Sequence, residues 1–214
     1  MPFDQAWSLQ KELYSEVLSS RDSSAVPPGP GYLLFVEHPH VYTLGKSGSS
    51  DNLLIPRDLL EKKGASFYHI DRGGDITYHG PGQIVGYPIL DLWAMKVGVK
   101  DYIHSLEESI ILLLATYGIE AGRLTHATGV WLDPGIRGRE RKICAIGVKI
   151  SRGISMHGFA FNVTTDLSYF SLINPCGFTD KAVTSMKQEL GKAPEIQEVK
   201  HRLREILMSC LTGP

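Results

Sequence analysis

The tetrapeptide Asn174-Pro175-Cys176-Gly177 places a single thiol in a sequence typical of a tight turn. Pro175 restricts the backbone around the cysteine, and Gly177 leaves the next amide unshielded by a side chain. Such a turn can present a thiolate to a substrate and offer an N–H group to a developing oxyanion. Because most free cysteines are buried and inert, the turn alone leaves a purely structural role open.

Lys142 is a residue that could activate such a thiol. It begins the segment Lys142–Ile150, whose pattern predicts a strand. In a regular strand the even positions share a face, so Lys142 would lie on the same side as Cys144 and the aliphatic residues that follow. A lysine on an apolar face either extends to solvent or is held in a pocket with a lowered pKa, as a catalytic lysine is. The sequence leaves these two alternatives open.

Small residues alternate with bulky ones in two further segments, Ala145-Ile146-Gly147 and Gly158-Phe159-Ala160. In a strand, the two small residues of each segment share one side and the bulky residue faces the other. A side formed by small residues could admit a thin ligand chain, or it could simply permit close packing.

The segment Arg72-Gly73-Gly74-Asp75-Ile76-Thr77-Tyr78-His79-Gly80-Pro81-Gly82-Gln83 is rich in both glycine and polar side chains. Its glycines permit positive φ and a close approach of the backbone to a ligand. It is not a phosphate-binding P-loop, since no Gly-Lys-Ser/Thr closes it, and Gly73-Gly74 has the wrong spacing for a dinucleotide site. We therefore interpret residues 71–83 as a binding loop rather than a rigid turn between two strands.

Histidines offer two weaker candidates for chemistry. His157 could act as a base for Cys176, although a structural histidine is the commoner case. His38 and His40 flank Pro39 as a pair that could suggest a metal site, but no third ligand follows nearby. We assign that pair to a turn and expect no metal.

Hydrophobic periodicity predicts the elements around these residues. Helices are expected near the N-terminus with Asp4 as cap and Phe3 on the inner face, from Asp101 to Tyr117 with Asp101 as cap and Ile103 on the inner face, and after Pro194. Strands are expected at 32–37, 41–44, 66–70, 84–89, 129–132, 142–150 and 157–163. Because strands come in runs with helices between and after them, the pattern favours an α+β fold with a mixed sheet.

Composition narrows the class of protein. The chain has 214 residues, which fits a single domain over 1–214, and 43% of them are hydrophobic. A net charge of −1 argues against broad nucleic-acid binding, and the apolar runs are too short to predict a membrane span. Cys144, Cys176 and Cys210 are widely spaced and form no CxxC pair. Without an expected targeting segment, this indicates a reducing compartment, the cytoplasm.

In combination, these segments resemble the lipoyl(octanoyl) transferase family. The stretch Arg72–Gln83 looks like the signature loop of that family. The resemblance covers most of the chain in the expected order, through His38–Gly45, Tyr87–Ile89, Gly129–Trp131, Lys142–Lys149, Ser151–Gly153, Met156–Val163 and Asn174–Gly177. Any one segment would be a weak signal, whereas the ordered set is specific.

The resemblance implies a fold and a set of site residues. The fold would be that of biotin and lipoate protein ligases, one α+β domain with a mixed, largely antiparallel sheet flanked by helices. Cys176 would carry the acyl thioester, and Lys142 would lower the pKa of its thiol and act as general acid and base. Substrate binding would fall to Arg72, Gly73, Gly74, Asp75, Ile76, Thr77, Tyr78, His79, Ala145, Ile146, Gly147, Gly158, Phe159 and Ala160.

The resemblance also implies partners. The octanoyl donor would be an acyl carrier protein, which holds the acyl group on phosphopantetheine. The acceptor would be a lysine of a lipoyl domain, in 2-oxoacid dehydrogenases or in the glycine cleavage H protein. Neither a metal nor a nucleotide would be needed, because a thioester is already activated. We expect a monomer with neither nucleic acid nor membrane as a partner.

Two departures from the family pattern concern the surroundings of Lys142. The segment Asp133–Glu140 (DPGIRGRE) is longer than the usual connection. Cys144 stands where a small residue such as alanine is common, so we expect a second thiol near the site.

Three alternatives remain at this point. An ATP-dependent lipoate or biotin ligase on the same fold would need a phosphate-gripping loop and no catalytic cysteine. A non-catalytic module that only holds lipoyl domains or acyl carrier proteins would not need both Lys142 and Cys176. A cysteine hydrolase using Cys176 and His157 would release free octanoate.

Overall fold

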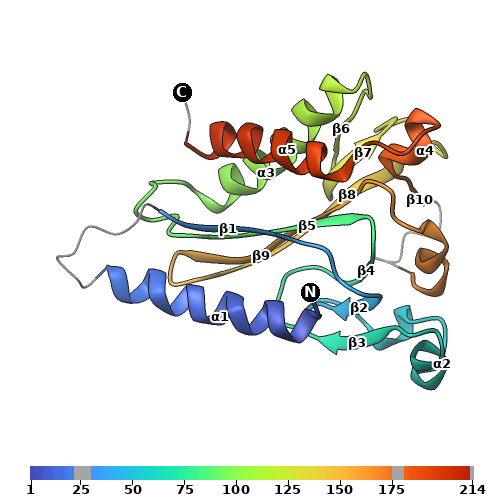
Figure 1. Ribbon diagram of the computed structural model, residues 1–214, viewed down its shortest axis with the longest axis horizontal. Helices are drawn as coiled ribbons and strands as arrows, with labels where there is room; N and C mark the ends of the chain where they lie inside the picture. Colours follow the sequence, from blue (N-terminus) through green and yellow to red (C-terminus); the bar gives the residue numbers. More distant parts are fainter. Residues whose placement is uncertain (22–29, 175–180, 213–214) are drawn as a thin grey trace.

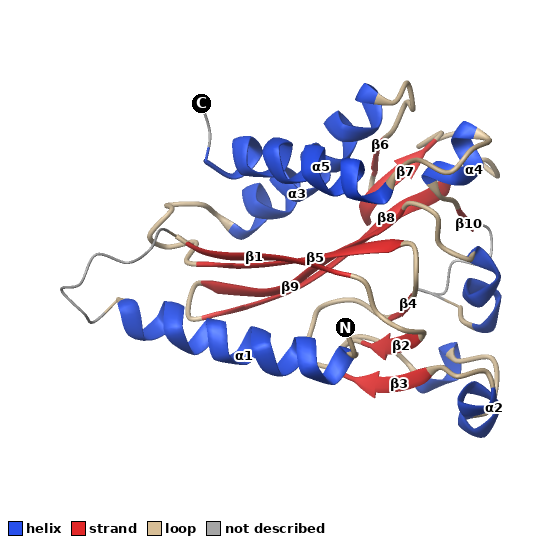
Figure 2. Ribbon diagram, in the orientation of Figure 1, coloured by secondary structure: helices blue, strands red, loops and turns tan. Residues whose placement is uncertain are grey.

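The larger sheet of the computed structural model forms the centre of the protein (Figures 1 and 2). The structure describes residues 1–21, 30–174 and 181–212. The strand order is β1–β5–β9–β8–β7–β6, with antiparallel pairing between neighbours, and β10 pairs in parallel with β8. The bounds are β1 (Gly31–Val36), β5 (Gln83–Leu90), β6 (Gly122–Leu124), β7 (Ala127–Leu132), β8 (Arg141–Ser151), β9 (Ile154–Asn162) and β10 (Ala182–Val183).

A smaller sheet lies beside the N-terminal end of the first helix (Figure 1). Its order is β3 (Ser66–His69), β2 (Val41–Leu44) and β4 (Ile76–His79). Strand β2 pairs in parallel with β3 and antiparallel with β4. The two sheets are therefore mixed and largely antiparallel, and the expected α+β class is confirmed.

Helices cover both faces of the larger sheet (Figure 2). Helices α3 (Val99–Thr116) and α5 (Ile196–Thr212) pack against each other over one face and bury the main apolar core. Helix α1 (Phe3–Ser20) packs on β5 and β9 from the other side. Shorter helical segments occupy the periphery: η1 (Ser50–Asn52), α2 (Arg57–Lys62), η2 (Leu167–Leu172) and α4 (Met186–Leu190). No helix within the described residues is both long and apolar enough to cross a membrane.

The three expected helices are present, but two expected caps are wrong. Helix α1 begins after Pro2 and α3 after Gly98, and neither helix has a side-chain cap. Asp4 and Asp101 instead lie in the first turn of their helices, where a negative charge complements the helix dipole. Each helix therefore starts one or more residues earlier than the acidic residue suggests.

The expected strands all occur, but the segment 71–83 is not a continuous loop. It contains β4, whose residues pair with the whole length of β2. The flanking glycines hide this strand in the sequence, because the partner that stabilises it comes from a distant part of the chain. Strand β6 was also missed, since three residues are too few to show a period.

Strand β8 is not regular where Lys142 lies, so the expected side for that lysine is wrong. Trp131 pairs with Lys142, but the preceding Val130 pairs with Cys144, so Ile143 is an extra residue in the ladder. Ile143 and Cys144 are both fully buried in the main core. The bulge therefore turns Lys142 away from the side of Cys144 and onto the side of Trp131.

Replacement of Ile110 by alanine tests the main core. Ile110 of α3 is fully buried in the main core, so Ile110→Ala is expected to lower the free energy of unfolding by about 2–5 kcal/mol. Leu112→Ala on the exposed side of the same helix is the control and should change it by about 0.5 kcal/mol at most. Equal losses in chemical denaturation of the two variants would contradict this packing.

Candidate functional site

A cavity of about 500 Å³ lies where the segment 70–79 crosses the larger sheet. Its walls come from the first turn of α1, the smaller sheet, the middle of β5, β8 and β9, and β10. All the residues expected to bind substrate line it, with the exception of Tyr78. Segments that are far apart in the sequence therefore meet around one space.

The floor of the cavity consists of small residues in facing pairs. Ala145 lies opposite Ala160, and Gly147 lies opposite Gly158. All four line the cavity. Gly158 must be a glycine, because a Cβ there would lie 2.2 Å from the carbonyl oxygen of Gly86 on β5. The small side of these two strands thus faces an open space instead of serving only close packing.

The roof of the cavity is the segment that precedes β4, held against β8 by backbone contacts. The N–H of Gly73 donates a hydrogen bond of 2.9 Å to the carbonyl oxygen of Val148. A Cβ at Gly147 would lie only 2.9 Å from the carbonyl oxygen of Gly73, so glycine permits this close approach. Arg72 is buried, and its Nη2 donates to the carbonyl oxygen of Thr43 at 2.7 Å and to its Oγ1 at 3.0 Å.

Asp71 ties the same roof segment to β8 and β9. Its Oδ2 lies 2.5 Å from Lys149 Nζ, and its Oδ1 accepts a hydrogen bond of 3.2 Å from His157 Nε2. Burial opposes ionisation of Asp71, but the hydrogen bonds from Lys149 and His157 hold its pKa below the ordinary value. Burial in turn lowers the pKa of His157 to about 4 in spite of Asp71. His157 is therefore neutral at pH 7.

Tyr78 is the one expected binding residue that does not line the cavity, and its assignment is corrected. Its side chain is fully buried in a separate apolar cluster and stacks on Tyr169 at a centroid distance of 4.9 Å. Its hydroxyl lies 2.7 Å from His40 Nδ1. Its neighbours in β4, Thr77 and His79, are on the other side of the strand and line the cavity.

A buried chain of hydrogen bonds leads from His79 at the cavity to Thr184, the residue that follows β10. His79 Nδ1 donates to Gln83 Oε1 at 2.8 Å, and Gln83 Nε2 donates to Asn162 Oδ1 at 2.9 Å. Asn162 Nδ2 then donates to the carbonyl oxygen of Thr184 at 3.1 Å. The N–H of Thr184 in turn donates to the carbonyl oxygen of Lys142 at 2.9 Å. The cavity wall and the backbone of Lys142 are thus parts of one hydrogen-bonded frame.

Lys142 lies at the cavity wall, which agrees with the pocket alternative rather than extension to solvent. Its Nζ is 4.6 Å from the centre of the Trp131 ring, a distance at which a cation is attracted to the ring. Its backbone is held on both sides, by β7 at Trp131 and by β10 at Val183. A half-buried ammonium held in this way can act on a group that enters the cavity.

Cys176 lies outside the described residues, as does Gly177, so its expected role stays a prediction. The described residues before and after it approach the cavity. Asn174 donates from its backbone to the carbonyl oxygen of Asn52, whose side chain donates to Asp75 in the roof at 2.5 Å. On the other side, Lys181–Val183 lines the cavity and pairs with β8 beside Lys142.

The two departures from the family pattern have clear structural outcomes. Cys144 is fully buried in the core, and burial raises the pKa of its thiol far above the ordinary value. The second thiol is near Lys142, as expected, but it does not line the cavity, because the bulge at Ile143 turns Cys144 to the opposite face. Residues 133–140 form the turn between β7 and β8, and Arg141 binds Asp133 and Glu189 at its base. Lys142 keeps its place in the ladder behind this longer turn.

His38 and His40 are structural, as expected for a turn. His38 Nδ1 donates to the carbonyl oxygen of Met1 at 2.8 Å, and its Nε2 lies 2.7 Å from the Tyr87 hydroxyl. His40 stacks on Tyr169 at a centroid distance of 4.2 Å. Within residues 1–21, 30–174 and 181–212, no group of three or more metal-ligating side chains comes together.

Several residues that line the cavity were not predicted to do so. Phe3 and Ile103 were expected on the core-facing sides of their helices. Ile70, Val85 and Phe170 have no sequence feature that indicates a binding site. Their residue types are ordinary for a core, so only the tertiary arrangement distinguishes a cavity wall from a core position.

Comparison with known proteins gives the family. The profile described as Lipoyl protein ligase A/B catalytic domain matches residues 2–208. This chain belongs to that family. An octanoyltransferase of Bacteroides fragilis (strain YCH46) is 53% identical over 216 residues, which cover 99% of this chain and 95% of the relative. An octanoyltransferase of Parabacteroides distasonis is 62% identical over 176 residues, covering 82% and 80% of the two chains.

Solved structures show the same fold. A bi-partite lipoate protein ligase from Thermoplasma acidophilum has a TM-score of 0.66 at 18% identity, covering 94% of this chain and 78% of that chain. A lipoate-protein ligase A bound with ATP has a TM-score of 0.66 at 18% identity, covering 94% and 80%. The expected lipoate ligase fold is therefore confirmed for this family member.

The buried histidines predict how stability depends on pH. Burial lowers the pKa of His38 to about 4, of His79 to about 3 and of His157 to about 4. An unfolded histidine has a pKa of about 6.5, so between about pH 6.5 and 4 the unfolded chain binds more protons than the folded one. Stability is therefore expected to fall as pH decreases through this window. The thermal unfolding midpoint, recorded at several pH values, measures the loss.

A single replacement isolates the histidine contribution. His38→Gln should make the unfolding midpoint less dependent on pH between about 6.5 and 4. His201→Gln changes an exposed histidine of α5 and serves as control. If His38→Gln and His201→Gln kept the same pH profile as the unchanged protein, the buried, neutral state of His38 would be disproved.

Proposed function

We propose that this protein transfers an octanoyl group from an acyl carrier protein to a lysine of a lipoyl domain, through an acyl thioester on Cys176. The observation that carries the proposal is the cavity, which runs from Lys142 over a floor of small residues. The octanoyltransferases that share about half of its residues or more over most of the chain support the choice of reaction.

The cavity suits a thin apolar chain rather than a bulky polar ligand. The facing pairs Ala145–Ala160 and Gly147–Gly158 leave a narrow space above the sheet. The two buried histidines of the cavity, His79 and His157, are held neutral by burial at ordinary pH. Burial of the acyl chain in this space provides the binding energy, at about 0.8 kcal/mol per methylene group.

The position of Lys142 at the cavity wall supports a role beside the acyl carbonyl. The chain enters 175–180 from Asn174, bonded to Asn52 below the roof, and resumes at Lys181–Val183 beside Lys142. This anchoring supports a position for Cys176 near the cavity. A cation within a few ångströms of a thiol stabilises the thiolate and lowers its pKa.

The reaction then takes two balanced steps. The Cys176 thiolate attacks the thioester carbonyl of the donor, a new carbon–sulfur bond forms, and the carbon–sulfur bond to pantetheine breaks, with the leaving thiolate taking up a proton from the Lys142 ammonium. The ε-amine of the acceptor lysine next attacks the acyl-Cys176 carbonyl and gives an amide, with the Cys176 thiolate as leaving group. The neutral amine of Lys142 accepts the proton that the attacking amine loses, which restores the ammonium beside the Cys176 thiolate.

The remaining features of the proposal follow from this chemistry. Because a thioester is already activated, neither a metal nor a nucleotide takes part. Residues 1–214 act as one catalytic domain and as a monomer in the cytoplasm. The acceptor is a lipoyl domain of a 2-oxoacid dehydrogenase or the glycine cleavage H protein, and nucleic acid and membranes are not partners.

Intact-mass analysis tests the covalent step. Incubation with octanoyl-carrier protein should add one octanoyl group to the protein, and Cys176→Ser should remove the adduct and slow transfer on the order of a thousandfold or more. Cys210→Ser replaces a thiol on α5 and should keep both adduct and rate. Full transfer by Cys176→Ser would refute the scheme.

The same assay separates the alternatives. Transfer that required ATP would favour a ligase, and release of free octanoate as fast as transfer would favour a hydrolase. Binding of carrier protein or lipoyl domain without any transfer would favour a non-catalytic module.

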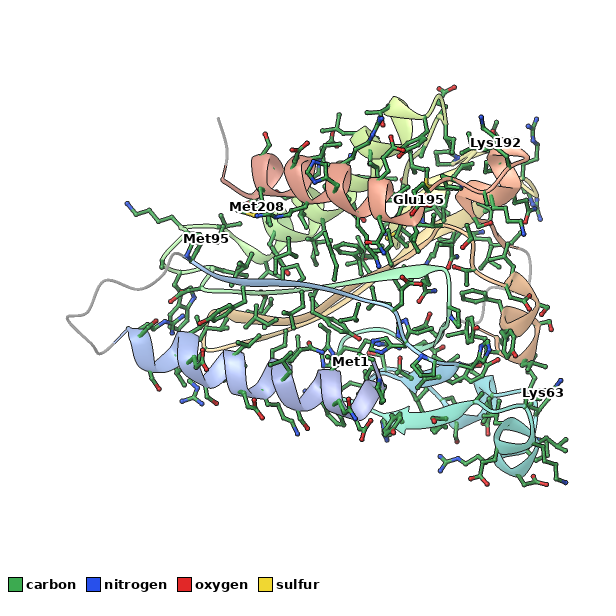
Figure 3. The ribbon with its side chains drawn as sticks, viewed as in Figure 1. Met1, Lys63, Met95, Lys192, Glu195 and Met208 are labelled. Carbon is green, nitrogen blue, oxygen red and sulfur yellow. The ribbon has the colours of Figure 1, made fainter. Side chains whose placement is uncertain are left out.

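A second test concerns Lys142. Lys142→Ala should raise the pKa of the Cys176 thiol toward its ordinary value of about 8.5 and slow transfer about 10²–10⁴-fold, because the thiolate and the proton acceptor are both lost. The pH dependence of thiol alkylation measures the first effect. Lys63→Ala, at the outer edge of the molecule beside α2 (Figure 3), is the matched control. An unchanged alkylation profile in Lys142→Ala would remove this lysine from the mechanism.

A further inference from the structure

The cavity has an open end and a closed end. Near Lys142 its walls include the exposed residues His126, Thr128 and Ala182. At the other end its walls are Phe3, Ile70, Tyr87 and His157, all of which are buried with an exposed fraction of 5% or less. The side-chain burial therefore places an opening beside Lys142 and a closed end at Phe3, while the exposed Gly73 and Gly74 lie in the roof.

The strands give the order of residues between the two ends. Along β8 the cavity passes Ala145 and Gly147 before it reaches Val148. The antiparallel neighbour β9 places Ala160 opposite Ala145 and His157 opposite Val148. A ligand chain that enters beside Lys142 must therefore travel along the strands toward His157 and the buried end.

Phe3 occupies that buried end, although it comes from the far N-terminus of the chain. It lies in the first turn of α1, and its exposed fraction is 3%. Its ring centre lies 5.1 Å from that of Tyr68, 5.4 Å from His38 and 6.4 Å from His79, which stacks on it. Aromatic rings thus surround Phe3 on several sides, so the ring has little freedom to move aside for a longer ligand.

The start of the chain is anchored so that Phe3 stays in place. The Met1 ammonium donates to the carbonyl oxygen of Glu37 at 2.7 Å, and the Met1 carbonyl oxygen accepts from His38 Nδ1 at 2.8 Å. Figure 3 shows Met1 at the end of α1, beside the smaller sheet. These contacts hold the N-terminal turn, and with it Phe3, in a fixed position between the two sheets.

We infer that Phe3 forms the end wall of the acyl cavity and sets the longest acyl chain that the enzyme accepts. This inference rests on the proposed function and adds a residue that determines its specificity. The neutral side chains of His79 and His157 at the same end are compatible with a terminal methyl group. Removal of the Phe3 ring should extend the cavity toward Tyr68 and Trp7, both of which contact Phe3 and are only partly buried.

A competition among donors tests the inference. The unchanged protein and Phe3→Ala are each given an equimolar mixture of hexanoyl-, octanoyl-, decanoyl- and dodecanoyl-carrier protein with a lipoyl domain. Product masses give the relative rates. Phe3→Ala is expected to raise the ratio of decanoyl to octanoyl transfer by about tenfold or more, since two further methylene groups can be buried. Phe3→Trp should act in the opposite direction and favour hexanoyl transfer.

Phe67→Ala is the matched control. Phe67 is a partly buried phenylalanine of β3 that packs in a different apolar cluster and does not line the cavity. It should leave the chain-length profile unchanged. If thermal unfolding shows that Phe3→Ala does not fold, Phe3→Leu takes its place in the test. Phe3→Leu is expected to raise the ratio of decanoyl to octanoyl transfer by a smaller factor.

The outcomes separate this inference from the proposed function. If the unchanged protein transfers no acyl group from any donor, the proposed function fails. If it transfers octanoyl groups while folded Phe3→Ala or Phe3→Leu keeps the same profile, Phe3 is not the end wall and the inference is overturned. A shift of the same size in Phe67→Ala would overturn it as well.

Discussion

The close contact between the roof segment and β8 is the constraint on which the site depends. At Gly147 the backbone of the roof comes so near that a Cβ would lie 2.9 Å from the carbonyl oxygen of Gly73. The hydrogen bond from Gly73 to Val148 and the ion pair between Asp71 and Lys149 hold it there. This contact gives the cavity its roof, and without it the cavity would lose a wall.

The bulge at Ile143 is the second feature that makes the site possible. It places Ile143 and Cys144 in the core and turns Lys142 to the cavity, beside Trp131. A regular strand would have sent the lysine toward the core side, at a high cost of desolvation. The pairing of β10 with β8 at Val183 then fixes the lysine backbone from the other edge. A local irregularity of one strand thus decides which side chain the substrate meets.

Local patterns in the sequence predicted most of the fold. The strands at 142–150 and 157–163 alternate in side-chain size. In the tertiary structure the small residues of both strands line the cavity, so the alternation in the sequence corresponds to a real side of the sheet. Strand β4 was missed because its hydrogen bonds are made to β2, which the local sequence cannot reveal. For the same reason the local sequence groups Tyr78 with the loop residues, although its side chain is buried in the apolar cluster on the other side of β4.

The sequence by itself determined the family, the class of fold and the small residues of the cavity floor. These follow from residue types and from the local periodicity of hydrophobic and small residues, both of which can be read from the sequence. The tertiary structure alone decided that Lys142 faces the cavity, that Cys144 is sealed in the core, and that Phe3 closes the buried end. Each of these depends on contacts between residues that are distant in sequence, such as Phe3 with His79. Such contacts leave no periodic trace, because either partner would look like an ordinary core residue by itself.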